Sequence, residues 1–245
     1  MNAKISTTRL EVTRLNTPLD LVAGIDRRWL AAWVAIFLVV TVLNITTPYN
    51  LGFATRILAY IGIVSCFIYA SATTRYDHWL LAALATTLLA DLFLIVLAAP
   101  LPGIAVFCVV QVIHAIRLRQ FVRTSPILYV TALVVMFVAG IFLQFSLIFM
   151  LAAFYACTIL YNCLAAKKLY DNTHQSITSA RMFWGFVAFI VCDIFVGLDF
   201  LINEGFIAES IPVVLIAAAT YVFYFPSQIL LASSGTRQPS TTRVK

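Results

Sequence analysis

Long apolar segments divide this chain, and their length constrains its fold more than any other feature. A helix needs about 17–25 apolar residues to cross a bilayer. Eight stretches meet or approach this length, at residues 29–47, 54–71, 78–98, 101–120, 126–143, 146–166, 181–202 and 211–231. The second and fifth are short, and only Gln144 and Phe145 separate the fifth from the sixth. We expect a tight hairpin there, with seven spans as the alternative.

The composition excludes an ordinary soluble domain. Hydrophobic residues make up 62% of the chain and charged residues 11%, whereas a soluble domain carries about 25% charged residues. The expected fold class is all-α, a polytopic membrane helix bundle of about eight transmembrane helices. Residues 1–28 and 232–245 are too short to build a core of their own. They are predicted to be cytoplasmic tails on either side of a transmembrane domain at residues 29–231.

Basic residues give an independent test of the number of spans. If the N-terminus is cytoplasmic, eight crossings place 15 of the 16 basic residues on the cytoplasmic side, with Arg56 on the other. The fifteen are Lys4, Arg9, Arg14, Arg27, Arg28, Arg75, Arg117, Arg119, Arg123, Lys167, Lys168, Arg181, Arg237, Arg243 and Lys245. The positive-inside rule expects such a bias, and a wrong span count would scramble it. Topology and anionic lipids therefore explain the net charge of +6, and no nucleic-acid partner is expected.

Two aspartates lie near the middle of apolar stretches. Asp91 occurs in LATTLLADLFLIVL and Asp193 in GFVAFIVCDIFVGL. An ionisable group at the centre of a membrane helix costs about 2.5–3.5 kcal/mol on insertion scales, and it generally faces the bundle interior. Two such groups in similar surroundings predict one shared polar site. The alternative is that each carboxyl only joins helices, through a hydrogen bond with Thr87, Gln111 or a tyrosine.

Further polar residues fall at the same depth as the aspartates. Counted from the predicted outer ends of their stretches, Gln111, Tyr155 and Tyr221 lie with the aspartates roughly 10–15 Å below the outer surface. Helical spacing extends this set toward the cytoplasmic side, where Arg117 would lie at the mouth of an interior cavity. The predicted substrate-binding residues are Gln111, His114, Tyr155, Asn162, Tyr221, Tyr224, Gln228 and Arg117.

Four stretches in this order resemble the YhhN family of membrane proteins, whose characterised members are lysoplasmalogenases. They are Ala90-Asp91, Gly103 to His114, Cys192-Asp193 and Thr220 to Gln228. Ala90 stands where the family has glycine, Cys192 where it has serine, and Gln111 where many members have histidine. The resemblance covers most of the chain. It implies hydrolysis of the vinyl-ether bond of lysoplasmalogens, with Asp91 and Asp193 as the catalytic residues.

The chemistry of that reaction suits two neighbouring carboxyls. Vinyl-ether hydrolysis begins with protonation of the alkenyl carbon, which leaves an oxocarbenium-like cation to which water adds. In a membrane cavity one carboxyl can keep its proton while the other is ionised, as in glycosidase carboxylate pairs. Arg117 or Arg119 is a candidate to hold the lipid phosphate, and the alternative is that these arginines only set the topology.

Two other function classes remain open at this point. Aspartates at matched depth, together with Pro226 inside the last stretch, also describe a proton-coupled transporter of a small molecule or lipid. A structural or regulatory subunit without chemistry is the third possibility. No HExxH or similar spacing supports a metal site, and no cofactor is expected. The expected partners are a membrane lipid substrate and the bilayer, and the short loops favour a bacterial plasma membrane.

Overall fold

The computed structural model describes residues 17–22, 24–46, 52–74, 77–123, 125–144, 146–173, 176–203, 205 and 212–235, and most of these residues are helical. A short 3-10 helix, η1 (Pro18–Val22), comes first. The α-helices that follow are α1 (Arg27–Thr46), α2 (Gly52–Thr73), α3 (His78–Asp91), α4 (Pro100–Arg119), α5 (Pro126–Leu143), α6 (Leu147–Asn172), α7 (Ile177–Asn203) and α8 (Val213–Ala232). A π-helical segment, η2 (Leu92–Val96), continues α3. The all-α fold class predicted from the sequence is confirmed.

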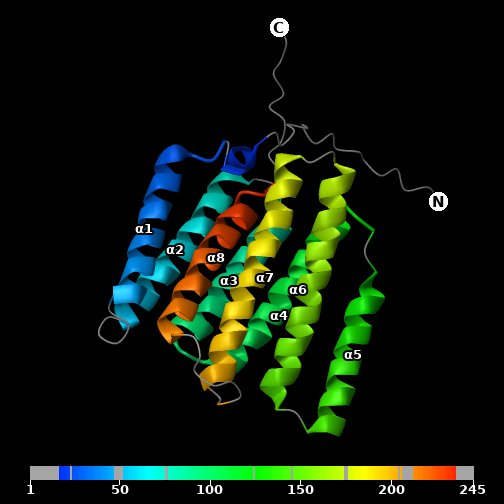
Figure 1. Ribbon diagram of the computed structural model, residues 1–245. Coiled ribbons are helices and arrows are strands. Elements are labelled where there is room, and N and C mark those ends of the chain that lie inside the picture. The colour runs from blue at the N-terminus through cyan, green and yellow to red at the C-terminus, as the bar shows by residue number, and fades with distance from the viewer. Residues whose placement is uncertain are drawn as a thin grey trace, which may run out of the picture.

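Within the described residues, seven helices are long and apolar enough to cross a membrane. They are α1, α2, α3 taken together with η2, α4, α6, α7 and α8. The shorter apolar stretch of α5 is Val130–Leu143, and α5 runs beside α6 in Figure 1. The protein is therefore a polytopic helical membrane protein, and an eighth crossing by α5 stays a prediction.

The hairpin expected between α5 and α6 is present. Gln144 ends α5 in the left-handed conformation, with φ 54°, and its N–H is bonded to the last turn of the helix. Phe145 lies outside the described residues. Two helices also extend beyond the predicted spans, since α6 continues to Asn172 and α7 begins at Ile177. Hydropathy marks only the apolar part of a helix, and the polar end of α6 is supported by an ion pair between Lys167 and Asp171 at 2.7 Å.

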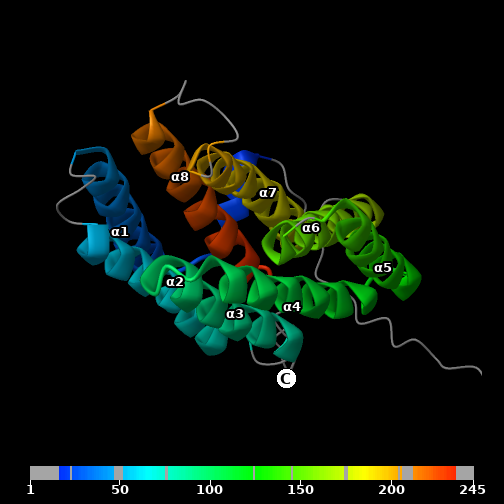
Figure 2. The same ribbon diagram turned by 90° about the horizontal axis from the view of Figure 1, so that it is seen from below.

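Six of the helices form a closed ring. In the order α2, α3, α4, α6, α7 and α8, each helix packs against the next, and α8 packs back against α2. Outside the ring, α1 lies against α2 and α8, while α5 lies against α6 (Figures 1 and 2). Successive helices alternate in direction, so η1, the start of α1 and the end of α8 meet at one end of the bundle (Figure 1). We call this the η1 end, which the sequence predicts to be cytoplasmic.

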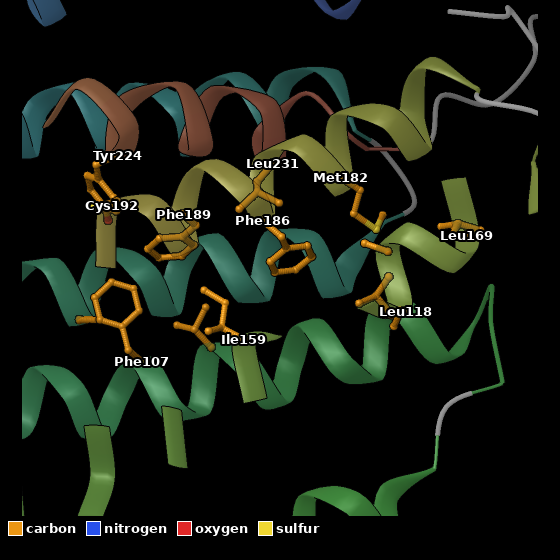
Figure 3. Close-up of a cluster of buried hydrophobic side chains, with 14 of the residues drawn as sticks. Phe107, Leu118, Ile159, Leu169, Met182, Phe186, Phe189, Cys192, Tyr224 and Leu231 are labelled. Atoms are coloured by element: carbon orange, nitrogen blue, oxygen red, sulfur yellow. The ribbon is translucent and has the colours of Figure 1, made fainter. Parts of the chain in front are cut away.

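An apolar cluster fills much of the ring interior. Side chains from α4, α6, α7 and α8 gather in it, and Figure 3 shows Phe107, Phe189 and Tyr224 on the side away from Leu169 and Met182. On the outer surface, large apolar side chains stay exposed, and Phe142 of α5 reaches 83% exposure. An apolar exterior around a filled interior suits a protein surrounded by lipid.

Part of the predicted N-terminal tail is packed onto the bundle. Arg181, at the start of α7, donates from Nε to the backbone oxygen of Leu21 in η1 at 2.7 Å. The same guanidinium donates from Nη1 to the backbone oxygen of Ser233 at 2.9 Å. Arg181 was expected only as a topology-setting charge, but it ties η1 and the end of α8 to α7.

Candidate active site

Asp91 is the last residue of α3. It faces the ring interior and is 2% exposed. The hydroxyl of Tyr224, on α8, donates to Asp91 Oδ2 at 2.5 Å. Thr87, one turn earlier in α3, instead donates to the backbone oxygen of Ala83 at 2.9 Å. Of the partners considered for this aspartate, the structure therefore selects a tyrosine from across the ring.

Asp193 has the same arrangement with a different pair of helices. It lies on α7, is half-buried, and accepts a hydrogen bond at Oδ2 from the hydroxyl of Tyr155 on α6 at 2.7 Å. No other hydrogen bond among the described residues reaches either carboxyl. The Oδ1 atom of each aspartate is therefore free to transfer a proton or to face a developing positive charge.

Aromatic rings connect the two aspartate–tyrosine pairs. The ring of Phe107 lies 5.9 Å from that of Tyr155 and 5.8 Å from that of Phe189. Phe189 in turn lies 5.6 Å from the ring of Tyr224. We call these four residues the aromatic row. Because the aromatic row has Tyr155 at one end and Tyr224 at the other, the aspartates bonded to these two tyrosines belong to a single cluster inside the ring.

The helices that carry the Asp91–Tyr224 hydrogen bond each have an unusual feature beside it. The π-helical segment η2 starts at the residue after Asp91, and Pro226 lies inside α8 two residues after Tyr224. Gly103 of α4 makes room for η2, because a Cβ there would clash with the side chain of Leu94. π-helical turns occur frequently at functional sites, and a proline removes one backbone hydrogen bond from its helix.

The ring also contains three buried side-chain amides, those of Asn162, Gln111 and Gln228. Asn162 donates from Nδ2 to both the side-chain and the backbone oxygen of Gln111, each at 2.9 Å. Gln228, on α8, is 1% exposed. Among the described residues, Gln111 Nε2 and both amide atoms of Gln228 have no hydrogen-bond partner.

Two other predicted binding residues, His114 and Tyr221, lie in different surroundings. His114 is 2% exposed and packs its ring edge-on against Phe186, with 5.1 Å between the ring centroids. Tyr221 makes no hydrogen bond to either carboxyl among the described contacts, and its ring lies 6.0 Å from that of Phe225. His114 therefore lies beside the apolar cluster of the ring interior, whereas Tyr221 packs against a second apolar cluster that includes Phe225, and neither residue joins the aspartate–tyrosine pairs.

Arg117 is fully buried at the η1 end. Its Nε donates to Asp77 Oδ2 at 2.9 Å, while Nη1 and Nη2 donate to the side-chain and backbone oxygens of Ser234 at 3.1 and 2.8 Å. These partners occupy the guanidinium, so the arrangement gives no support to a phosphate-binding role for Arg117.

Sequence reasoning missed Asp77, Ser234 and Phe189 of the aromatic row. Asp77 directly precedes α3 and caps it, since its Oδ1 accepts from the N–H of Leu80 at 3.0 Å. An aspartate immediately before an apolar stretch is a helix-start signal, and this signal could have drawn attention to Asp77. No comparable signal marks Ser234, whose role depends on where α8 ends.

An open groove of about 280 Å³ lies on the outside of the ring, between α4, α5 and α6. Its lining is almost wholly apolar, and neither aspartate belongs to it. The lining residues are Val112, Ala115, Ile116, Arg119, Val130, Leu133 and Phe154. In the part of the chain that the structure describes, no three histidine, cysteine, aspartate or glutamate side chains are grouped as metal ligands would be.

Comparison with known proteins identifies the family. Residues 51–235 match the model of the YhhN family, so more than half of the chain is covered. The matched range contains both aspartates, both partner tyrosines and the whole helical ring. The chain matches no curated protein and no solved structure. From the family match, this chain belongs to the YhhN family.

Proposed function

We propose that this protein is a lipid-acting membrane hydrolase that cleaves the vinyl-ether bond of lysoplasmalogen-type lipids. One observation carries the proposal. Asp91 and Asp193 lie in one cluster, each held at Oδ2 by a tyrosine hydroxyl with Oδ1 left unbonded among the described residues. Such a pair of carboxyls can supply both the acid and the carboxylate that the activity implied by the YhhN resemblance would use.

The two carboxyls divide the work of hydrolysis. One transfers its proton to the alkenyl carbon remote from the ether oxygen, and a cation forms at the carbon bonded to that oxygen. The ionised carboxylate stabilises this cation and accepts a proton from the water that attacks it. Collapse of the hemiacetal breaks the carbon–oxygen bond and returns a proton to the departing oxygen. One water is consumed, and the products are a fatty aldehyde and a glycerophospho-base.

The tyrosines have a positioning role in this proposal. A hydroxyl donated to Oδ2 fixes the carboxyl plane, so that Oδ1 points in one direction. Enzymes gain rate when a reacting group is held in a productive geometry before the substrate arrives. The π-helical segment that follows Asp91 also favours a functional site over plain helix packing, which a regular helix would serve equally well.

Aldehyde release from lysoplasmenylethanolamine by detergent-purified protein tests the proposal. We expect turnover by the wild type and a loss of at least a hundredfold in Asp91→Asn and in Asp193→Asn, since general acid–base groups contribute about 10²–10⁴-fold. Asparagine still accepts the tyrosine hydrogen bond, so both variants should fold. Thr87→Val is the matched control, because the Thr87 hydroxyl is bonded within its own helix. If both asparagine variants retain hydrolysis, the proposal is contradicted.

Transport is the second candidate, and one feature of α4 favours it. Gln111, His114 and Arg117 follow each other at intervals of three residues, and all three are at most 2% exposed. This buried polar row leads from the level of the aromatic row toward the η1 end, as a proton route would. Substrate-dependent proton flux into liposomes, without aldehyde release, would favour a transporter.

A further inference from the structure

We infer that Gln111 and Gln228 form a subsite for the free glycerol hydroxyl of the lipid. This inference rests on the proposed function, because the lipid is the one whose vinyl ether the aspartates would cleave. It assigns a substrate group to two residues that do not touch the carboxyls by any hydrogen bond in the described structure.

Burial without a partner is the first observation. Gln111 is 0% exposed and Gln228 is 1% exposed. Three of their four amide atoms nevertheless lack a hydrogen bond among the described residues. Buried polar atoms are nearly always paired in folded proteins, so orphaned ones call for a ligand or a bound water. Two such amides on the interior of one ring indicate a site that is completed by a polar group.

Their height in the ring is the second observation. Gln111 follows Phe107 by four residues on α4, and Gln228 follows Tyr224 by four residues on α8. Each amide therefore lies one helical turn, about 6 Å, from the aromatic row on the side of the η1 end. Because Phe107 and Tyr224 both contact Phe189, the two glutamines lie at similar depths.

The lipid has a matching group at this distance. In a lysoplasmalogen the vinyl-ether oxygen and the free hydroxyl are on adjacent carbons of glycerol. A lipid with its double bond at the aspartates therefore places this hydroxyl about one helical turn away. Its phosphate lies further along, on the side of the η1 end.

The unbonded atoms also match a hydroxyl in number and kind. Gln228 Oε1 is an acceptor, and the Nε2 atoms of Gln111 and Gln228 are donors. A hydroxyl offers one donor and two lone pairs, so it can satisfy all three. Asn162 holds Gln111 by Oε1, which leaves Nε2 as the end that faces the ligand. A phosphate would instead call for a guanidinium, and the nearby Arg117 is already bound by Asp77 and Ser234.

A pair of substrates tests the assignment. We would compare lysoplasmenylethanolamine with its 2-deoxy analogue, which lacks the glycerol hydroxyl, in wild type, Gln228→Met and Gln111→Met. Methionine has nearly the shape of glutamine without its polar atoms. The kcat/KM of the wild type should be higher for the hydroxyl lipid by on the order of tenfold or more. With the analogue bound, the amide atoms of the two glutamines would have no hydrogen-bond partner. Each glutamine variant should lose this preference through a lower kcat/KM for the hydroxyl lipid alone.

Ser227→Ala is the matched control. Ser227 neighbours Gln228 and is 0% exposed, but its hydroxyl is bonded to the backbone oxygen of Tyr224 at 2.7 Å. This variant should keep the wild-type preference. The inference is overturned if the wild type shows no preference, if the glutamine variants keep it, or if they lose activity equally on both lipids. The last result would mean that the amides bind a water or support the fold.

A binding measurement separates failure of this inference from failure of the proposed function. If the wild type hydrolyses neither lipid, binding of the non-hydrolysable 1-alkyl lysophosphatidylethanolamine is compared with that of its 2-deoxy analogue. Tighter binding of the hydroxyl lipid by on the order of tenfold, lost in Gln228→Met, supports the subsite although the reaction is absent. Equal binding of the two lipids overturns it.

Discussion

Arg117 and Asp77 form an ion pair inside the bundle, with Arg117 Nη2 2.9 Å from Asp77 Oδ2. The side-chain exposures are 0% for Arg117 and 4% for Asp77. Because Arg117 also binds Ser234, the pair joins the start of α3, the last turn of α4 and the residues after α8. The ring is therefore tied together at its η1 end by charge and hydrogen bonds.

Removing one partner of this ion pair should destabilise the fold strongly. In Asp77→Ala the buried guanidinium of Arg117 keeps its charge and loses its counter-ion, which typically costs about 3–5 kcal/mol. Unfolding in mixed detergent micelles measures the change. The exposed pair of Lys167 and Asp171 is the control, and Asp171→Ala should change stability by less than about 1 kcal/mol.

A double variant separates the charge effect from lost packing. In Asp77→Leu with Arg117→Met both charges are absent, so no buried charge is left unpaired. Replacing a whole buried ion pair by apolar side chains is often close to neutral, and we expect the double variant to recover most of the lost stability. A double variant as unstable as Asp77→Ala would show that the hydrogen bonds to Ser234, not the charges, hold this end.

The tyrosine hydroxyls should matter more for turnover than for folding. Tyr224→Phe and Tyr155→Phe each remove one hydrogen bond to a carboxyl while keeping the ring in the aromatic row. Hydrogen bonds to charged groups are worth about 1.5–3 kcal/mol, so kcat/KM for lysoplasmenylethanolamine should fall about ten- to hundredfold. The expected change is in kcat more than in KM, because the hydroxyls orient the carboxyls and do not bind the lipid.

Tyr69→Phe serves as the control for both tyrosine variants. Tyr69 lies on α2, outside the aspartate cluster, and stacks on Trp29 with 4.0 Å between the ring centroids. Its loss of a hydroxyl should leave kcat/KM near the wild-type value. If Tyr69→Phe and the two site variants lost activity equally, the positioning role of Tyr155 and Tyr224 would have no support.

Adding a methyl group at Gly103 should disturb the segment that follows Asp91. A Cβ there meets the side chain of Leu94 in η2 and lies 3.4 Å from the backbone oxygen of Ala90. Gly103→Ala should therefore destabilise the protein by about 1–3 kcal/mol, as overpacking does, and lower turnover. Thermal unfolding in detergent measures the first effect. Gly197→Ala, where nothing lies within 4 Å of the added Cβ, should be neutral or slightly stabilising.

Cysteine labelling should decide whether α5 crosses the membrane. Single cysteines at Thr17, Ser125 and Ser146, in a variant without the native cysteines, would be treated with an impermeant maleimide from either side. If α5 spans, Thr17→Cys and Ser125→Cys react from one side and Ser146→Cys from the other. Reaction of Ser125→Cys and Ser146→Cys from the same side would leave seven crossings, the alternative that the sequence left open.

Hydropathy was sufficient to predict the helices, because a bilayer forces each spanning segment to satisfy its own backbone hydrogen bonds. The bounds of α1, α2, α4 and α5 agree with the predicted stretches to within two residues. The change to a π-helix at Leu92 was not predicted, and it occurs where α4 approaches closely at Gly103. The residues around Leu92 do not indicate which other helix packs against them.

For the site, depth could be counted from the sequence only to within about one helical turn, and rotation about each helix axis could not be counted at all. Tyr221 was assigned to the level of the aspartates, yet Tyr224, about one turn further along α8, is the residue that binds Asp91. Arg117 shows the same limit. Its position near a helix end was predictable, whereas its burial against Asp77 follows from how α3, α4 and α8 pack.

The sequence by itself determined that this chain is a helical membrane protein, which residues are expensive to bury, and roughly how deep each one lies. These properties depend on the length and polarity of single segments. Only the tertiary structure decided which helices close the ring, which tyrosine holds each aspartate, and which buried amides stay unpaired. Those choices depend on helix rotation and packing, which are set by contacts between segments far apart in the chain.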